Sequence, residues 1–380
     1  MSFDLSFFTL SFRKERVDEV RGGVRFDWGE VFFGQSQKET PMSVSPPARA
    51  MPEEPQTSPA PRSWQQLIAV LGPFIGLALV IGLFSLSPDI RGTFLSLDNF
   101  RGVATQTVIV GLGALGMTLI IISGGIDLSV GSVFALTSVV VAILLNKHVS
   151  PGLAVLAAIA VGGVTGAING TLITKLRVTP FIVTLGMLGV LRGMASWLAN
   201  EQAVNAPGYW ITGLAATFPN PAWLLVTPGV WITIALGIVT AIILRQTVLG
   251  RYIVAIGSNE ITSRLSGLSV DKLKIAIYAL AGLFFGLAGA LQFGRLSQGD
   301  PTVDVGAELD VIAAVVIGGG SLSGGEGSVL GSLLGALIMA LLRNGSQQMG
   351  WPAYVQQIII GIVIIAAVAL DRLRHRGTSK

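Results

Sequence analysis

The stretch that decides the fold is residues 103–145, VATQTVIVGLGALGMTLIIISGGIDLSVGSVFALTSVVVAILL, in which Asp127 is the one charged residue. It consists of two long apolar runs that meet at a Ser-Gly-Gly turn, residues 123–125. A run of about 17–25 apolar residues can cross a bilayer as a helix, because only helices and closed barrels satisfy the backbone in hydrocarbon. The stretch therefore predicts two membrane-spanning helices joined by a tight turn.

The rest of the chain is also poor in charge. Of its 380 residues, 51% are apolar and 12% are charged, whereas about a quarter of a soluble domain is charged. Residues 1–62 alone hold 17 of the charged residues, which leaves the remainder less polar still. A water-soluble body of this size could not cover its surface with so few charges. The composition therefore predicts a polytopic membrane protein and excludes a soluble enzyme.

Long apolar runs recur from Trp64 almost to the C-terminus. Those long enough to span a bilayer lie at 66–86, 103–122, 127–145, 151–173, 181–199, 225–244, 275–293, 327–343 and 353–370. A shorter run, Val305–Gly318, is either a tenth span or a re-entrant element.

The basic residues indicate the orientation. The loop Arg245–Lys274 carries five basic and two acidic residues, Lys175 and Arg177 stand two spans earlier, Arg62 precedes the first run, and the C-terminal tail is basic. By the positive-inside rule all of these face the cytoplasm, so the number of crossings is even. The predicted fold class is all-α: a polytopic membrane helix bundle of about ten transmembrane helices with both termini cytoplasmic. The outer side then receives residues 201–222 and the acidic residues Asp300, Asp304 and Glu308.

Residues 1–62 form a separate, polar segment that ends in the Pro- and Ser-rich stretch Pro41–Pro61. It lacks the basic start, apolar run and cleavage site of a secretory signal. We expect a disordered cytoplasmic tail, although translation that begins at Met42 or Met51 is an alternative. The chain thus divides into a tail, 1–62, and a transmembrane domain, 63–380.

Glycines recur at four-residue spacing, which places bare backbone on one helix face and lets helices approach closely. The repeats are Gly162, Gly166 and Gly170; Gly327, Gly331 and Gly335; and the pair Gly282 and Gly286. A faint internal echo, Gly-Ser-Val at 131–133 and again at 327–329, suggests a structural repeat.

Several chemistries are excluded. The chain has no Cys, and its two His residues, His148 and His375, lie far apart, so neither thiol chemistry nor a thiolate or imidazole metal site is expected. Gly111, Gly113 and Gly116 match a dinucleotide fingerprint but lie inside an apolar span, and no Lys follows a Gly as a P-loop requires. We predict no catalytic residue, cofactor or metal.

The segment 116–132, GMTLIIISGGIDLSVGS, closely resembles the signature of permease subunits of ATP-binding-cassette importers for monosaccharides of the ribose, xylose and arabinose type. Its turn comprises Gly124, Gly125, Asp127, Ser129 and Gly131. Further similar stretches lie at 170–186, 250–260, 264–267, 309–319, 321–328 and 369–374. The resemblance extends over about residues 64–376, so the domain 63–380 is identified as a permease domain.

The resemblance implies a multi-pass protein of the bacterial inner (plasma) membrane that forms the path for a monosaccharide and is not an enzyme. Its implied partners are an ATP-binding subunit, a periplasmic sugar-binding protein, a second permease copy or a paralogue, and membrane lipid, without nucleic acid. An importer for an amino acid or a signalling molecule is the alternative. An ion-coupled transporter fits less well, because Asp127, Asp310 and Glu326 lie at the ends of apolar runs.

The resemblance also places an ATPase-docking helix in the long cytoplasmic loop, with a plain solvated loop as the alternative. The docking residues it implies are Asn259, Glu260, Arg264, Leu265 and Gly267. Family members resemble Glu-Ala-Ala-x-x-x-Gly here; this chain keeps the glycine but has Ile261 in place of the glutamate.

Polar residues within the spans are candidates for the translocation path, or for helix packing. They are Thr118, Ser123, Thr184 and Arg192. Arg192 either extends to the outer interface or pairs within the bundle. Asp127 is predicted to cap the helix that follows it.

Overall fold

The computed structural model describes residues 63–219 and 221–376. The predicted N-terminal tail, 1–62, and the alternative start sites therefore lie outside the described residues. The elements are α1 Ser63–Ser85, α2 Arg91–Phe94, α3 Leu97–Ile122, α4 Val130–Asn146, α5 Pro151–Leu176, α6 Pro180–Leu198, β1 Val204–Asn205, α7 Tyr209–Ala215, the 3-10 turn η1 Ala222–Leu224, α8 Pro228–Gln246, α9 Val248–Ser258, α10 Glu260–Leu265, α11 Val270–Leu296, β2 Gln298–Gly299, α12 Ala307–Ile317, α13 Val329–Gln348 and α14 Ala353–Arg376.

Each predicted apolar run coincides with a helix, which confirms the all-α class. Six helices are long and apolar enough to cross a membrane, namely α3, α5, α6, α8, α11 and α13. In the described part of the chain, the sheet consists only of the two-residue strands β1 and β2, which pair antiparallel through Val204 and Gly299. Prolines at the first position of α5, α6 and α8 start those helices, because that position needs no backbone donor.

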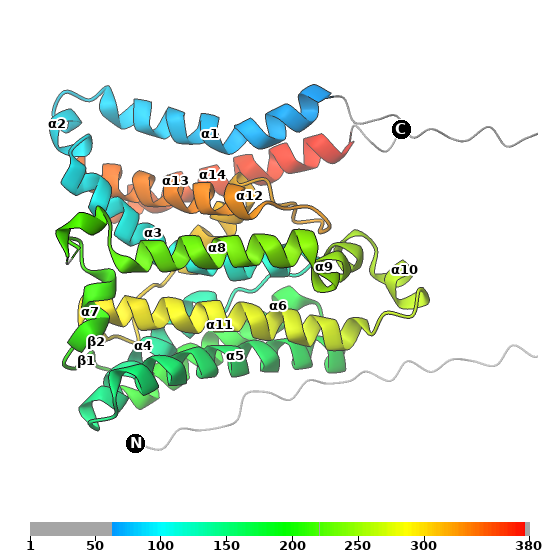
Figure 1. The fold of residues 1–380 in the computed structure, drawn as a ribbon. Helices are drawn as coiled ribbons and strands as arrows, with labels where there is room; N and C mark the ends of the chain where they lie inside the picture. Colours follow the sequence, from blue (N-terminus) through cyan, green and yellow to red (C-terminus); the bar gives the residue numbers. More distant parts are fainter. Residues whose placement is uncertain (1–62, 220, 377–380) are drawn as a thin grey trace, which may run out of the picture. The chain divides into compact units, whose positions relative to one another are not determined.

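The glycine repeats bring helix backbones into contact, as predicted. A Cβ on Gly166 would overlap the backbone of Tyr278, and one on Gly170 would lie 2.7 Å from the Cα of Ile275. These contacts join α5 to α11, which run side by side in Figure 1. In the same way Gly331 and Gly335 bring α13 against the backbone of α12. Larger side chains at these seams would force the helices apart.

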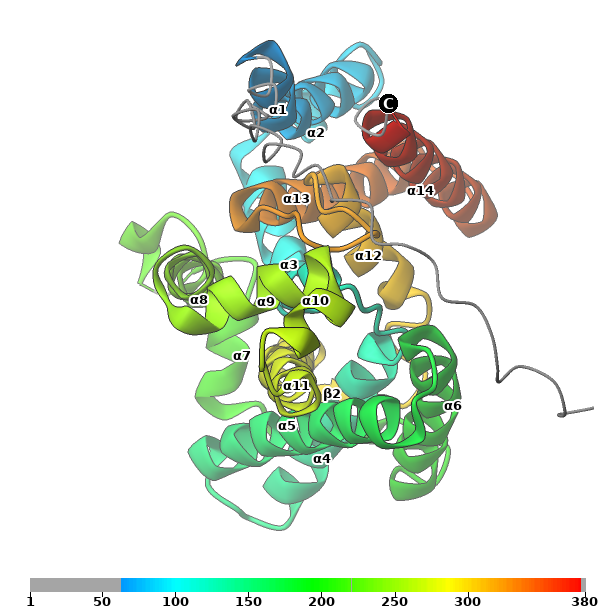
Figure 2. The same cartoon turned by 90° about the vertical axis from the view of Figure 1, so that its right-hand side faces the viewer.

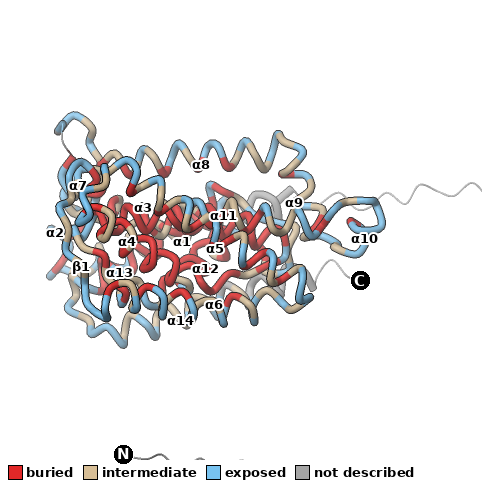
Figure 3. Tube along the Cα trace, turned by 90° about the horizontal axis from the view of Figure 1, so that it is seen from below, coloured by how far each residue is buried: buried red, intermediate tan, exposed pale blue. Residues whose placement is uncertain are grey.

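The burial pattern is that of a membrane bundle (Figure 3). In the most apolar window of α3, 83% of the residues are buried, against 17% in α6 and 22% in α8. The side chains that α6 and α8 expose are nevertheless apolar: Ile182, Leu185 and Trp197 on α6, and Ile234, Ile238 and Ile242 on α8. Apolar outer faces on an apolar core are stable in hydrocarbon and not in water.

Two helices are shorter than the sequence predicts. The expected full span at 127–145 begins only at Val130, and the short run Val305–Gly318 forms the 11-residue helix α12. Eleven residues of helix measure about 16 Å, roughly half the hydrocarbon core. Non-helical backbone precedes each helix, at 123–129 and at 300–306, where positive φ at Gly124 and Gly306 breaks the helical path. The run Val305–Gly318 is therefore helical over only about half the thickness of the hydrocarbon core, and the structure alone does not choose between a tenth crossing and a re-entrant element.

The two short helices belong to an inverted repeat. In one half α3 is followed by α4, α5 and α6, and in the other α11 is followed by α12, α13 and α14. The contacts correspond: α5 packs on α11 as α13 packs on α3, and α4 packs on α6 as α12 packs on α14. The repeated Gly-Ser-Val sequence does not mark corresponding helices of this repeat. Residues 131–133 lie at the start of α4, whereas residues 327–329 lie at the start of α13, which is the counterpart of α5.

The ends of the bundle differ. In Figure 1, α9 and α10 lie at one end, where α1 begins and α14 ends, whereas α2, α7, β1 and β2 lie at the other. Viewed from the α10 end in Figure 2, α10 lies in front of the bundle between α9 and α11, with α5 and α6 on one side and α13 and α14 on the other.

Candidate functional site

A short helix, α10, lies where the docking element is predicted, and two of the predicted residues define its ends. The side chain of Asn259 accepts a hydrogen bond from the backbone N–H of Thr262 at 2.9 Å, which caps the first turn. Gly267, at φ +84°, follows the last turn in the left-handed conformation that glycine adopts without strain. The sequence therefore folds this stretch into a helix with defined ends rather than a plain solvated loop.

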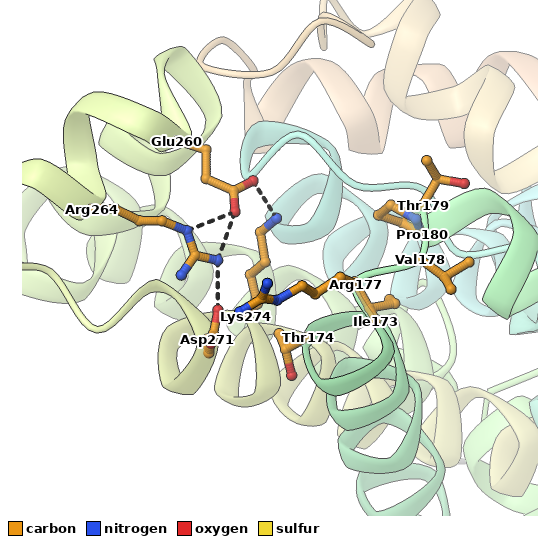
Figure 4. Close-up of a pocket in the computed structure, with 10 residues that line it drawn as sticks. All are labelled: Ile173, Thr174, Arg177, Val178, Thr179, Pro180, Glu260, Arg264, Asp271 and Lys274. Atoms are coloured by element: carbon orange, nitrogen blue, oxygen red, sulfur yellow. Dashed lines mark hydrogen bonds and ion pairs between the residues drawn. The ribbon is translucent and has the colours of Figure 1, made fainter. Parts of the chain in front are cut away.

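Ion pairs fix α10 to the start of α11 (Figure 4). The Glu260 carboxylate accepts hydrogen bonds from Arg264 at 2.9 Å and from Lys274 at 2.6 Å. Arg264 also donates to Asp271 at 2.6 Å. Glu260 and Arg264, predicted as docking residues, therefore hold the helix in place.

Hydrogen bonds within this network shift the pKa values of Glu260 and Arg264. Burial raises the pKa of Glu260, but the hydrogen bonds from Lys274 and Arg264 outweigh it and leave that pKa below its ordinary value. The hydrogen bonds to Asp271 and Glu260 raise the pKa of Arg264. Both shifts favour the charged forms of Glu260 and Arg264, which the ion pairs require.

A cavity of about 510 Å³ lies between this network and the α5–α6 connection. The connection contributes residues 173–174 and 177–180, and the network contributes its four charged side chains (Figure 4). Among the described residues, Arg177 is the lining cation without an ion pair. The cavity is polar, carries an excess of positive charge and lies at the α10 end of the bundle.

The outer face of α10 is apolar. Leu265 is 85% exposed and Ile261 is 73% exposed, and their spacing of four residues places both on one helix face. The sequence predicted Leu265 but treated Ile261 only as a departure from the family pattern. Its four-residue spacing from Leu265 was the signal that could have identified it.

The signature turn is built around Asp127, which is buried. One carboxylate oxygen accepts the backbone N–H of Ser129 at 2.8 Å and its hydroxyl at 2.6 Å. The other accepts the side-chain amide of Asn169 on α5 at 3.2 Å. The predicted helix cap is wrong in detail, because α4 begins at Val130 and Asp127 lies too far upstream to reach its first free N–H groups. Asp127 instead ties the non-helical segment before α4 to α5.

The glycines of the turn contact different elements. Gly125 lies against the hydroxyl of Tyr278, where a Cβ would come within 2.5 Å of it. Gly131, in the first turn of α4, faces the start of α12: a Cβ there would lie 2.7 Å from the Asp304 carbonyl oxygen and from the Glu308 carboxylate. The N-terminal ends of the two short helices therefore meet, with Glu308 between them.

The path candidates lie in different surroundings. Thr118 donates to the carbonyl of Ala114 and contacts the hydroxyl of Ser332 at 2.8 Å, between α3 and α13. Ser123 donates to its own helix, and Thr184 lies 3.3 Å from the carbonyl oxygen of Ile126. The structure does not bring these three hydroxyls together.

Arg192 links two parts of the bundle. Its guanidinium on α6 donates to the carbonyl oxygens of Pro301 at 2.8 Å and Val303 at 2.7 Å. It therefore holds the non-helical segment that precedes α12, which favours the pairing alternative over an extended side chain at the interface.

Charged residues around α12 include partners that the sequence did not predict. Arg343 on α13 pairs with Asp310, and Gln292 donates to Asp304 at 3.1 Å. Arg343 lies 33 residues from Asp310 along the chain, so no local spacing signalled the pair.

Comparisons with known proteins agree with this architecture. The family described as "Branched-chain amino acid transport system / permease component" matches residues 99–368. The ribose import permease protein RbsC of Escherichia coli K12 is 42% identical over 312 residues, 79% of this chain and 93% of the relative. RbsC of Bacillus subtilis is 40% identical over 325 residues, which are 84% of this chain and 98% of the relative. The L-arabinose ABC transporter permease protein AraH of Azospirillum brasilense is 34% identical over 311 residues, which are 82% of this chain and 89% of the relative. No solved structure matches the chain.

These matches extend from α3 into α14 and include both halves of the inverted repeat. They also identify a transporter subunit rather than an enzyme, in agreement with apolar outer helix faces that require a membrane. The protein is thus a multi-pass membrane permease, and the chain belongs to the branched-chain amino acid transport system permease-component family.

Proposed function

We propose that the protein is the membrane-spanning permease subunit of an ATP-binding-cassette importer in a bacterial inner membrane, and that its cargo is a monosaccharide. The observation that carries the substrate class is the similarity to relatives named for ribose, fructose and L-arabinose, over about four-fifths of the chain. A neutral, hydroxylated solute needs no fixed countercharge on its path. The scarcity of charge in the spans is consistent with such a cargo.

In the proposed topology the chain crosses the membrane ten times, and both termini are cytoplasmic. Eight of the crossings are continuous helices, and the other two are the short helices α4 and α12 with their non-helical leads. The end of α5, the end of α8 and the start of α9 lie near the α10 end in Figure 1, and the chain there carries the basic residues Lys175, Arg177, Arg245 and Arg251, which supports a cytoplasmic position for that end. The described chain also begins and ends there.

We assign α10 as the docking element for the ATP-binding subunit. Exposure of Ile261 and Leu265 to water is unfavourable. Burial of each side chain in a groove of a partner would contribute about 1.5–3 kcal/mol to the free energy of binding. The ion pairs of Glu260 and Arg264 give this helix a fixed position on α11, so that a force applied to it reaches the bundle.

The other partners follow from the same orientation. A periplasmic binding protein would deliver sugar at the end that carries α7 and β1. A second permease, either a copy or a paralogue, completes the transporter, and lipid covers the apolar faces of α6 and α8.

Transport requires a bundle with two states whose equilibrium the ATPase shifts by binding one state better than the other. Discontinuous helices at a repeat interface commonly form the central site of transporters. We therefore place the path near the meeting point of α4 and α12, where Arg192 and Thr184 hold the two non-helical segments. Thr118 and Ser123 remain candidates for its continuation along α3.

The alternative cargo is an amino acid or a signalling molecule. The family description names branched-chain amino acids, so the substrate test includes them.

The test uses the permease reconstituted in liposomes with its ATP-binding and binding-protein subunits. We expect ATP-dependent uptake of a labelled pentose or hexose and none of labelled leucine; uptake of leucine alone would reject the sugar assignment. Leu265→Asp should abolish copurification of the ATPase and uptake. Leu86→Asp is the matched control. Leu86 is similarly exposed, at 82%, but it follows the C-terminal end of α1, at the end of the bundle opposite α10.

A further inference from the structure

Three chain segments meet backbone to backbone beside the docking helix. They are the last residue of α3 and the turn after it, residues 122–125; the end of α9, residues 257–258; and the loop 321–327 between α12 and α13. The backbone N–H of Gly325 donates a hydrogen bond to the carbonyl oxygen of Ile122 at 2.8 Å. This bond joins the loop to the end of α3 at the point where α9 also ends.

Glycines make the contact this close. A Cβ on Gly257 would overlap the Ile122 carbonyl oxygen and would lie 2.6 Å from the backbone nitrogen of Gly325. A Cβ on Gly324 would lie 2.7 Å from the Gly257 carbonyl oxygen and 3.0 Å from the Cα of Gly124. The neighbours in each case are backbone atoms, which cannot rotate away as a side chain can. We call Gly124, Gly257, Gly324 and Gly325, with the Ile122 carbonyl, the glycine junction.

Each segment of the glycine junction leads to an element with a role in transport. Two residues after Ser258, α10 begins. Gly124 and Gly125 lie in the non-helical segment that precedes α4, and the loop 321–327 follows α12. The glycine junction therefore connects the docking helix directly to both discontinuous helices. At Gly257 and Gly324 the contacts are between backbone atoms, which leaves little room to absorb a displacement.

We propose that the glycine junction is the coupling point of the transporter: it moves as one unit and passes the displacement of α10 to α4 and α12. This inference rests on the proposed function. Its positioning residue is Gly257, because its α-carbon is the surface that α9 presents to the Ile122 carbonyl.

A purely structural role predicts a different result. If the glycines only permit tight packing, a substitution lowers the amount of folded transporter. The transporter that does fold still imports sugar in proportion to the ATP that it hydrolyses. If they couple, the folded variant hydrolyses ATP but imports less sugar per ATP. The ratio of the two rates separates these roles independently of yield.

The first test is Gly257→Ala in the complete transporter in liposomes. We expect uptake per ATP hydrolysed to fall about tenfold, within the usual range of coupling between sites. Gly189→Ala is the matched control on α6, because a Cβ there meets open space. A folded Gly257→Ala transporter with the wild-type ratio would overturn the proposal.

A second variant decides the matter if Gly257→Ala does not fold. The chain contains no Cys, and a Cβ on Gly325 would lie 2.6 Å from the Oγ and 3.2 Å from the Cα of Ser258, so cysteines at these two positions would lie close together and could be tested for a disulfide. Oxidation of the Ser258→Cys, Gly325→Cys pair should leave uptake at the level of the reduced sample or raise it, because the parts move together. Loss of uptake on oxidation, reversed by reduction, would show that the glycine junction must open and would reject the proposal. Absence of ATP-dependent sugar uptake by the wild-type complex would instead reject the proposed function.

Discussion

Asp127 shows how one buried carboxylate can hold an irregular segment in place. It accepts hydrogen bonds from Ser129 and Asn169, and all three side chains are buried. In Asp127→Ala these donors lose their acceptor, and each unsatisfied buried group costs about 1–3 kcal/mol. We expect the apparent melting temperature of the purified permease to fall by about 5 °C or more, together with its abundance in the membrane.

Asp127→Asn is the control for this prediction. It keeps one acceptor for Ser129, and its new amide can donate to the side-chain oxygen of Asn169, which has no partner. The variant should therefore retain most of the stability. Normal stability of Asp127→Ala combined with altered sugar preference would contradict the assignment and would place Asp127 in the path.

Sequence reasoning at the level of residues succeeded where the signal was local. Asn259 and Gly267 lie at the ends of α10 because capping depends on a few adjacent residues. The bond of Asp127 to Asn169, 42 residues away, and the pair of Asp310 with Arg343 depend instead on how helices pack. No spacing along a single chain contains that information.

At the level of elements, α10 provides a pH-dependent test of its attachment. Glu260 faces Arg264 on its own helix, Lys274 and Asp271 on α11, and Arg177 across the cavity. Its pKa is lowered from the ordinary 4.5, so its stabilising contribution is complete above that value and is lost as pH falls through the lower folded value. A nitroxide on Ser266→Cys should show constant mobility from pH 7 to about 5 and higher mobility only below about 4.5.

Glu260→Gln is the variant that isolates this effect. Since its side chain is neutral, the label should be mobile at every pH, and the acid transition should disappear. A transition that persists in this variant would assign the acid sensitivity to a group other than Glu260.

The helices themselves were predictable, because each apolar run is a local property of the sequence. Their continuity was not. Runs of similar hydropathy form the unbroken helix α3 and the half-length helix α12. The difference depends on Gly306, in the left-handed conformation, and on contacts of the preceding segment with Arg192. Hydropathy detects burial in the membrane, whether the buried backbone is helical or not.

At the scale of the whole molecule, the inverted repeat explains why the two short helices meet. In each half the second helix starts beside the first helix of the opposite half: α4 packs on α11, and α12 packs on α3. Because the halves are related by inversion, the starts of α4 and α12 face each other at Gly131 and Glu308. A site at this interface contacts both halves, so rocking of one half against the other would open it alternately to the two sides.

The orientation of the whole molecule can be tested with single cysteines, since the native chain has none. Gln202, Lys175 and Ser266 are exposed. Gln202 shortly precedes β1, Ser266 follows α10, and Lys175 lies in the last turn of α5, which ends near α10 in Figure 1. In intact spheroplasts a membrane-impermeant maleimide should label Gln202→Cys, and it should label Lys175→Cys and Ser266→Cys only after permeabilisation. Thr378→Cys in the C-terminal tail should behave like Ser266→Cys if the number of crossings is even. Labelling of Thr378→Cys from outside would mean an odd number, and the most direct cause would be that the segment 298–320 turns back instead of crossing.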